Sequence, residues 1–356
     1  MARVAVLMSG GVDSSAAAML LAREGHEVIG ITARMWGDDS RCCDEEDIRS
    51  AQRVCHALGV RHVVLDRRDE FRKRVVDSFR AGYLDGLTPN PCSACNREIK
   101  FGDLFRAAMT FGCDRVATGH YAGLAEYEGR VLIREPASAE KSQTYFLALI
   151  HPCSLGRLSF PLAGYTKDEA RAMLSERGLA ARPGESQDLC FITSGRYEEF
   201  LRNETNSAGG AGAARGPGNL LDTDGNVVGT HRGHFAYTIG QRLGHHGRRS
   251  YVIEKRPATN EVVVGEREMA MVTRIAAAGS NWFVDPAGLE GESLLVKYRY
   301  NTAAAPARIL RPGDGRFSVV TDEPCFAPAP GQVLACYRDG FLLGGGVIAG
   351  TGPEAT

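Results

Sequence analysis

Two groups of residues in this chain have types and spacings that suit group-transfer chemistry. The first is the stretch SGGVDSS at residues 9–15, which directly follows an apolar run. The second is a set of cysteines: Cys92 and Cys95 lie three residues apart, and Cys190 lies in an acidic, polar stretch much later in the chain. A glycine-rich turn is suited to phosphate, and paired cysteines are suited to sulfur or metal chemistry.

The elements around SGGVDSS predict a phosphate site. Residues 4–8 are expected to form a buried strand and residues 12–24 a helix that ends at Gly25. This order places residues 9–11 at the carboxyl end of a strand, where open α/β sheets bind ligands, with a helix N-terminus beside it. Ser14 and Ser15 would add hydroxyl donors, and Asp13 would hold Mg²⁺ or fix the loop. The lysine of a Walker-type loop is missing, which indicates cleavage away from the γ-phosphate.

Cys92 and Cys95 are expected on a loop that leads into a helix over residues 97–112. Cys95 would lie near the helix N-terminus, where the dipole lowers a thiol pKa, and Arg97 and Lys100 would add positive charge. The chain has 10 cysteines and no secretory leader, which favours metal-binding, catalytic or buried cysteines over structural disulfides. We expect structural roles for Cys42, Cys43, Cys55, Cys113, Cys153, Cys325 and Cys336.

Composition narrows the class of protein. The formal net charge is −1 and 44% of the 356 residues are apolar, which is typical of a soluble globular protein. No apolar run is long enough to span a membrane, so we expect a cytoplasmic protein without a membrane partner. Nucleic acid would have to be bound by local basic clusters such as Arg248 with Arg249, or Lys297 with Arg299.

Strand and helix patterns alternate over the first ~150 residues, which predicts an α/β domain with a mostly parallel sheet. Further strands are expected at 26–36 and 61–66, and a helix capped by Asp44 is expected between them. The glycine-rich stretch 203–218 is typical of a linker, ordered only with RNA, and short β-like runs follow it. We expect a catalytic domain at 1–202, a small mostly-β domain at 203–270 and a β-barrel at 271–356.

The SGGVDSS loop resembles that of ATP pyrophosphatases, which activate a substrate by adenylation. Further motifs narrow the resemblance: TPNPCSACNREIKF, ATGHYA, KSQTYFL, ESQDLCFI, FAYTIGQR and LGGGVI follow in this order. Together they resemble the tRNA-specific 2-thiouridylases, from about residue 3 to 348. The resemblance implies an ATP-dependent enzyme that converts uridine-34 of tRNA to 2-thiouridine and releases AMP and pyrophosphate.

The resemblance also implies roles for individual residues. Cys190 would carry a persulfide, and Cys95 would be its catalytic partner and form a disulfide with it. The ATP site would be made by Leu7, Met8, Ser9, Gly10, Gly11, Val12, Asp13, Ser14, Ala33 and Gly119. Contacts to tRNA or to the target base would be made by Asn90, Pro91, Cys92, His120, Lys141, Ser142, Gln143, Arg299, Tyr300 and Gln332. We also expect Mg²⁺ held by Asp13, a persulfide or sulfide donor protein as a partner, and a monomeric protein.

Two departures from the family pattern leave an alternative open. Many members have Asp at the position of Cys92 and Lys-Asp-Gln at residues 141–143. Cys92, Cys95 and Cys190 would therefore also suit a [4Fe–4S] cluster that carries sulfide on its open iron. A more distant alternative is an ATP-dependent amidotransferase or ligase acting on a small molecule, which would not need the paired cysteines. A third is a non-catalytic RNA-binding or sulfur-relay module, which would release no AMP.

Overall fold

The computed structural model describes residues 1–37, 44–179, 189–192, 197–207, 216–245, 248–313 and 315–352. Cys42 and Cys43 lie outside the described residues, and so does part of the expected linker. The chain forms two compact units, each described by itself below. The first unit comprises residues 1–76, 91–193 and 337–343, and the second comprises residues 77–90, 194–336 and 344–356. The division into three domains with boundaries at 202 and 270 stays a prediction.

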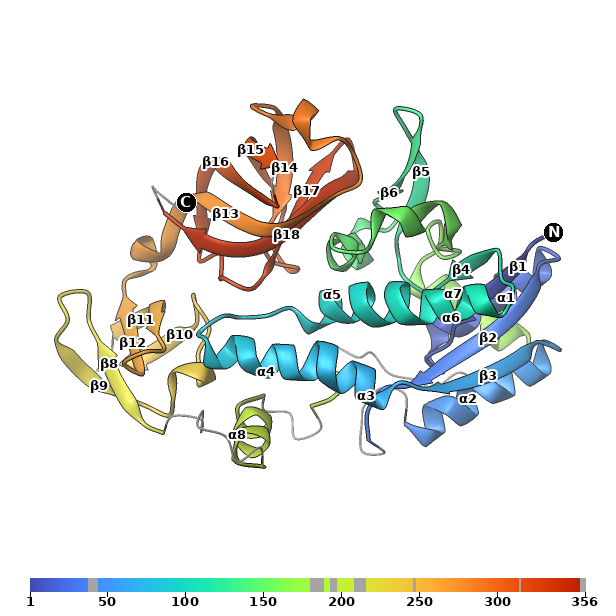
Figure 1. Ribbon diagram of the computed structural model, residues 1–356, viewed down its shortest axis with the longest axis horizontal. Coiled ribbons are helices and arrows are strands. Elements are labelled where there is room, and N and C mark those ends of the chain that lie inside the picture. The colour runs from blue at the N-terminus through green and yellow to red at the C-terminus, as the bar shows by residue number, and fades with distance from the viewer. Residues whose placement is uncertain are drawn as a thin grey trace. The chain divides into compact units, whose positions relative to one another are not determined.

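A parallel sheet forms the centre of the first unit (Figure 1). Its strand order is β3-β2-β1-β4-β7, and every described pair is parallel. The strands are β1 (Arg3–Leu7), β2 (Glu27–Arg34), β3 (Arg61–Asp66), β4 (Arg115–Ala117) and β7 (Leu158–Ser159). The chain runs from β1 to one side and returns on the other, so the switch point lies between β1 and β4. The predicted α/β fold is confirmed.

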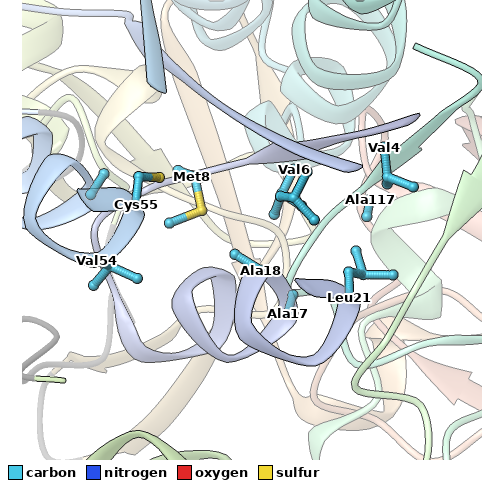
Figure 2. Packing of buried hydrophobic residues seen from close by; sticks show 11 residues of the cluster. Val4, Val6, Met8, Ala17, Ala18, Leu21, Val54, Cys55 and Ala117 are labelled. Carbon is cyan, nitrogen blue, oxygen red and sulfur yellow. The ribbon is translucent and has the colours of Figure 1, made fainter. Parts of the chain in front are cut away.

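Helices α1 (Val12–Arg23) and α2 (Glu45–Ala57) pack on this sheet. The predicted cap of α2 is confirmed, because the Asp44 side chain accepts from the Asp47 N–H. Figure 2 shows the core: Met8, which directly follows β1, and Cys55 of α2 lie close together, near the alanines of α1. Gly30 of β2 permits this approach, since a Cβ there would lie 2.6 Å from the Cys55 sulfur.

A helical run follows β3 that the sequence interpretation missed. It comprises α3 (Arg68–Phe71), the π-helical turn η1 (Arg72–Val76) and α4 (Asp77–Leu84). Its many charged residues, among them Arg72, Lys73 and Arg74, mask the helical pattern in the sequence. The apolar positions Phe71, Val75 and Phe79 are nevertheless buried at helical spacing.

The next helix begins earlier than predicted. Helix α5 (Pro91–Cys95) continues into the π-helical segment η2 (Asn96–Leu104) and α6 (Phe105–Thr110). Cys92 and Cys95 therefore lie inside a helix, and the prediction of a loop was wrong. Proline at the first helical position explains the start, because its fixed φ suits the helix and its missing N–H is not needed there.

The rest of the first unit is a hairpin, short 3₁₀ turns and one helix. The hairpin is β5 (Gly123–Tyr127) with β6 (Arg130–Arg134), and helix α7 (Lys167–Glu176) begins with a capping box between Thr166 and Glu169. The 3₁₀ turns are η3 (Ala139–Lys141), η4 (Thr144–Leu147) and η5 (Pro152–Arg157).

The second unit is mostly β, as predicted. After α8 (Tyr197–Ser207) comes a sheet of order β10-β11-β12-β8-β9. Its strands are β8 (Gly218–Leu221), β9 (Val227–His231), β10 (Arg242–His245), β11 (Arg248–Arg256) and β12 (Glu261–Gly265). Residues 203–207 are helical, so this part of the expected linker was wrong.

Six strands of the described chain then close into a barrel, because β13 pairs with both β16 and β18. They are β13 (Met271–Trp282), β14 (Ser293–Lys297), β15 (Ala305–Gly313), β16 (Arg316–Phe326), β17 (Val333–Arg338) and β18 (Phe341–Thr351). Short 3₁₀ turns are η6 (His234–Ala236), η7 (Arg267–Ala270) and η8 (Pro286–Leu289). None of the helices described is long and apolar enough to cross a membrane.

Candidate active site

Helix α1 begins with a bare N-terminus at the switch point of the sheet. Its N-cap is Gly11, and no side chain caps the helix, so the first N–H groups have no partner within it. Gly10 has φ +77°, and a Cβ there would lie 2.3 Å from the Asp47 carbonyl oxygen. Only glycine fits this conformation and this space. The loop therefore offers backbone donors and a partial positive charge, which fits a phosphate group.

The serine hydroxyls of the loop hold the loop itself. The Ser14 hydroxyl accepts from the Ser9 N–H at 3.1 Å and donates to the Gly11 carbonyl at 3.2 Å. The Ser15 hydroxyl donates to the same carbonyl at 2.9 Å, and both serines are buried. Because the Ser9 N–H is used in this way, the backbone N–H groups of residues 10–12, rather than these hydroxyls, are left to face a ligand.

Gly119, in the turn that follows strand β4, packs against the first turn of α1. A Cβ on Gly119 would lie 2.5 Å from the Asp13 carbonyl carbon and 2.6 Å from the Ser14 nitrogen. Such distances are far below van der Waals contact, so the turn after β4 and the phosphate loop form one tightly packed structure. Two of the predicted ATP-site segments are thereby brought together.

Tyr121 links the phosphate loop to residues 141–143. Its hydroxyl donates to Asp13 Oδ1 at 2.9 Å, and its backbone N–H donates to Gln143 Oε1 at 2.9 Å. The Gln143 N–H donates in turn to the Tyr121 carbonyl. Burial, and then the charge of Asp13, raise the pKa of Tyr121, so its hydroxyl stays a donor. Asp13 thus has a hydrogen-bond partner outside the phosphate loop. This bond agrees with one of the two roles expected for Asp13, which is to fix the loop. Tyr121 lies inside ATGHYA, but its role was missed.

His120 is buried between aromatic rings. Its Nδ1 lies 2.8 Å from the Thr118 hydroxyl, and the ring packs near Phe101 and Phe160. Burial lowers the pKa of His120 well below 6.5, and the charge of Lys100 lowers it further. The imidazole is therefore neutral near pH 7. Its contact with tRNA stays a prediction.

Ala33 is buried in β2, where it pairs with Leu65. The neighbouring Thr32 hydroxyl lies 2.8 Å from His62 Nε2. With both side chains packed inside the unit, Thr32 and Ala33 can offer only backbone groups to a ligand. Adenine selection by these groups stays a prediction.

The three cysteines of the expected site differ in exposure. Cys92 is exposed, Cys95 is buried and Cys190 is partly buried. The described ranges contain no group of three His, Cys, Asp or Glu side chains arranged to hold a metal. The iron–sulfur cluster therefore stays an untested alternative, and we derive no step through it. Residues 180–188, just before Cys190, lie outside the described ranges.

Cys190 lies in a turn that an aromatic neighbour anchors. The Ile192 N–H donates to the Leu189 carbonyl at 3.0 Å and closes the turn. The buried ring of Phe191 packs against Trp36 and Phe71, with ring centroids 6.2 and 5.9 Å away. Beside this cluster is a cavity of about 640 Å³ at the ends of β2 and β3, lined by Trp36, Gly37, Asp66, Arg68, Asp69, Glu70 and Arg72. Trp36 and Phe71 were missed because only contacts across the fold reveal their role.

Asn96 follows Cys95 directly and carries an unsatisfied acceptor. Its Nδ2 donates to the Phe146 carbonyl at 3.1 Å, whereas its buried Oδ1 has no hydrogen-bond partner among the described residues. An unpaired buried acceptor costs about 1–3 kcal/mol. An incoming donor would recover this cost, so the position next to Cys95 favours a ligand.

The remaining predicted residues have the following surroundings. Lys141 is the last residue of the 3₁₀ turn η3. The Ser142 hydroxyl is buried, and its oxygen lies 3.0 Å from the Thr144 hydroxyl oxygen. In the second unit, Arg299 donates to the Ala327 carbonyl at 2.9 Å. Gln332 Nε2 donates to the Thr88 carbonyl at 2.7 Å.

The basic cluster of Lys297 and Arg299 lies at the end of a strand rather than along it. Strand β14 ends at Lys297, and the ammonium of Lys297 lies 5.7 Å from the centre of the Tyr300 ring. The chain turns after Lys297, so strand alternation no longer separates these side chains.

The other described cysteines are buried, with one exception. Cys55, Cys113, Cys325 and Cys336 are buried, and burial raises the pKa of Cys55 to about 11. These four fit the structural role expected for them. Cys153 is exposed, so its expected structural role is not seen.

Three models of known protein families match successive parts of the chain. Residues 2–194 match the model described as the tRNA methyl transferase HUP domain. Residues 211–266 match the tRNA methyl transferase PRC-barrel domain, and residues 272–348 match the aminomethyltransferase beta-barrel domain.

Full-length relatives carry a more specific name. A protein of Chloroflexus aurantiacus named tRNA-specific 2-thiouridylase MnmA is 42% identical over 360 residues, covering 98% of this chain and 99% of the relative. A protein of the same name from Acidithiobacillus ferrooxidans is 41% identical, and the alignment covers 97% of this chain and 98% of the relative. Another from Carboxydothermus hydrogenoformans is 39% identical, and the alignment covers 97% of each chain. With this identity along nearly its whole length, the chain belongs to the tRNA-specific 2-thiouridylase family of enzymes.

Proposed function

We propose that this protein uses ATP to convert uridine-34 of tRNA to 2-thiouridine. The observation that carries the proposal is the bare N-terminus of α1 at the switch point, in the same compact unit as Cys95 and Cys190. A backbone-lined phosphate site supports nucleotide activation, and two thiols support sulfur transfer. The family relationship gives tRNA as the substrate class.

The first step is activation of a poor leaving group. The uracil O2 attacks the α-phosphorus of ATP, and the bond to pyrophosphate breaks. The loop at residues 10–12 would hold the departing pyrophosphate with its N–H groups, which stabilises the developing negative charge. The absence of a Walker lysine agrees with attack at the α-phosphate rather than the γ-phosphate.

The second step is sulfur transfer. A persulfide on Cys190 attacks C2 with its terminal sulfur, and AMP leaves with the original oxygen. Cys95 then attacks the Cys190 sulfur of the resulting bridge, which releases 2-thiouridine and forms a Cys95–Cys190 disulfide. An external thiol reduces that disulfide by exchange and restores both cysteines.

Further components complete the proposal. Mg²⁺ would neutralise charge on the phosphates, with Asp13 as the nearby carboxylate whose Oδ1 already accepts from Tyr121. A persulfide donor protein would load Cys190, and the enzyme would act in the cytoplasm as a monomer. The alternative, sulfide carried on a cluster held by three cysteines, makes the same product and needs its own test.

The test is reconstitution with defined components. The protein is incubated with ATP, Mg²⁺, a persulfide donor and an unmodified tRNA(Lys) transcript, and 2-thiouridine, AMP and pyrophosphate are measured. We expect the three products in equal amounts, and none of the nucleoside with a transcript carrying cytidine-34. Absence of 2-thiouridine under both aerobic and anaerobic conditions would refute the function.

Cysteine variants separate the mechanisms. Cys190→Ser should abolish thiolation and AMP release while pyrophosphate is still released in the first step. Cys95→Ser should stop the reaction before 2-thiouridine is released from Cys190. The matched control is Cys153→Ser, since Cys153 is exposed and outside the proposed chemistry. Iron and sulfide bound after anaerobic reconstitution, lost in Cys92→Ser, would instead support the cluster.

A further inference from the structure

The short connector at residues 85–90 joins helix α4 to helix α5 and ends at Asn90, next to Pro91 and Cys92. These three residues are predicted to surround the target base. The first part of the connector is held by helix α4, because the N–H groups of residues 85–87 donate to carbonyls of its last turn. Pro89 and Pro91 have no N–H to donate. The part that follows Leu87 must therefore be fixed mainly by groups from elsewhere.

Side chains from distant parts of the second unit hold three carbonyls, one at the end of α4 and two in the connector. His234 Nε2 lies 2.9 Å from the Leu84 carbonyl oxygen, and Lys255 Nζ donates to the Leu87 carbonyl at 3.1 Å. Gln332 Nε2 donates to the Thr88 carbonyl at 2.7 Å. Sequence separations of 150, 168 and 244 residues make these tertiary rather than local contacts.

Lys255 is partly buried, with its ammonium group among acceptors. Besides Leu87, its ammonium donates to the Tyr237 carbonyl at 3.0 Å, and it lies 5.7 Å from the centre of the Tyr83 ring. Burial of the amine is strong enough to lower the pKa of Lys255 to about 7. A buried amine is unfavourable unless acceptors surround it. The two carbonyls and the ring are those partners, so the site is built around Lys255.

The connector is also closely packed. Gly331 has φ +94°, and a Cβ there would lie 2.8 Å from the Thr88 nitrogen, whose N–H donates to the Pro330 carbonyl at 2.7 Å. Gly86 has φ +78°, and a Cβ there would lie 2.5 Å from Pro257 Cγ. Polar anchors and close packing therefore act on the same few residues.

We propose that Lys255 and Gln332 are positioning residues, which hold the connector and thereby set Asn90, Pro91 and Cys92 for the base that is modified. This inference rests on the function proposed above. Lys255 comes from β11 and Gln332 from the turn before β17, so two separate β-structures would fix the base-facing segment. Gln332, expected from the sequence to contact tRNA, acts here on the protein's own backbone.

The experiment compares Lys255→Met and Gln332→Ala with the wild-type protein. Methionine keeps the length of the lysine side chain and removes its donors, whereas Lys255→Arg keeps a cation and tests rescue. Lys167→Met, at the start of α7, is the matched control. Three quantities are measured: the turnover rate of tRNA thiolation at saturating substrates, the affinity for tRNA, and hydrogen exchange of the amides of residues 85–90.

We expect Lys255→Met and Gln332→Ala each to lower the turnover rate by about tenfold or more, since a small misplacement near reacting groups has a large effect. The dissociation constant for tRNA should stay within about threefold, exchange in the connector should rise about tenfold, and Lys255→Arg should recover most of the loss. Unchanged connector exchange in both variants would overturn the proposal, even with a loss of activity, because the residues would then act on the RNA directly. Exchange is measured without RNA, so it remains a test of the positioning role if no 2-thiouridine is formed by the wild-type protein.

Discussion

Gly119 provides a sharp test of how the phosphate loop is built. In Gly119→Ala, the added methyl would lie 2.5 Å from the Asp13 carbonyl carbon and 2.6 Å from the Ser14 nitrogen. Ordinary contacts of this kind are about 3.5–4.0 Å, so the two segments must separate by about 1 Å. The obstructing atoms are backbone atoms of a helix, which cannot turn aside as a flexible side chain would.

The magnitude follows from this separation. Overpacking of a close-packed interior costs about 1–3 kcal/mol, and a displacement of about 1 Å at a catalytic site costs up to about 100-fold in rate. We expect Gly119→Ala to lower the free energy of unfolding within that range. We also expect the catalytic efficiency with ATP to fall by about 100-fold.

The assay pairs urea denaturation with steady-state kinetics at varied ATP and saturating tRNA. Gly164→Ala is the control, because a Cβ on Gly164 would meet no atom within 4 Å. If Gly119→Ala binds ATP and unfolds like the control, the close approach is not required, and the account of the loop is wrong.

Three further predictions concern neighbouring residues. His120 is neutral in the folded protein because its pKa lies well below 6.5. Below pH 6.5 only the unfolded chain therefore gains the proton, and the free energy of unfolding falls by about 1.4 kcal/mol per pH unit. His120→Gln should reduce this loss in denaturation curves measured between pH 7 and 5, and an unchanged slope would contradict the prediction. Tyr121→Phe removes the 2.9 Å bond to Asp13 and should weaken equilibrium ATP binding by up to about tenfold; wild-type affinity would show that Asp13 needs no such support. Phe191→Ala leaves the turn without its buried ring and should raise the rate of Cys190 alkylation several-fold, about the effect of a 1 kcal/mol local loosening; mass spectrometry of the labelled peptide measures it, and an unchanged rate would argue against the aromatic anchor.

The amino-acid sequence determined the features that depend on local pattern. The strand, glycine turn and helix over residues 3–23 follow from apolar runs and from conformations that only glycine adopts. The Asp44 cap and most of the short β-strands follow in the same way. The order of the motifs along the chain indicated the family, because this order can be read from the sequence whereas contacts between residues cannot.

Only the tertiary structure decided which residues support these motifs. The helix that contains Cys92 and Cys95 begins at Pro91. The helical run from Arg68 to Leu84, which includes a π-helical turn, was not predicted because its charged residues mask the apolar pattern. Tyr121 on Asp13, Phe191 against Trp36, and Lys255 on the Leu87 carbonyl join residues that are 108, 155 and 168 positions apart. Local periodicity carries no information about such contacts, since they arise when separate elements pack and leave a buried carboxylate, ring or carbonyl that needs a partner.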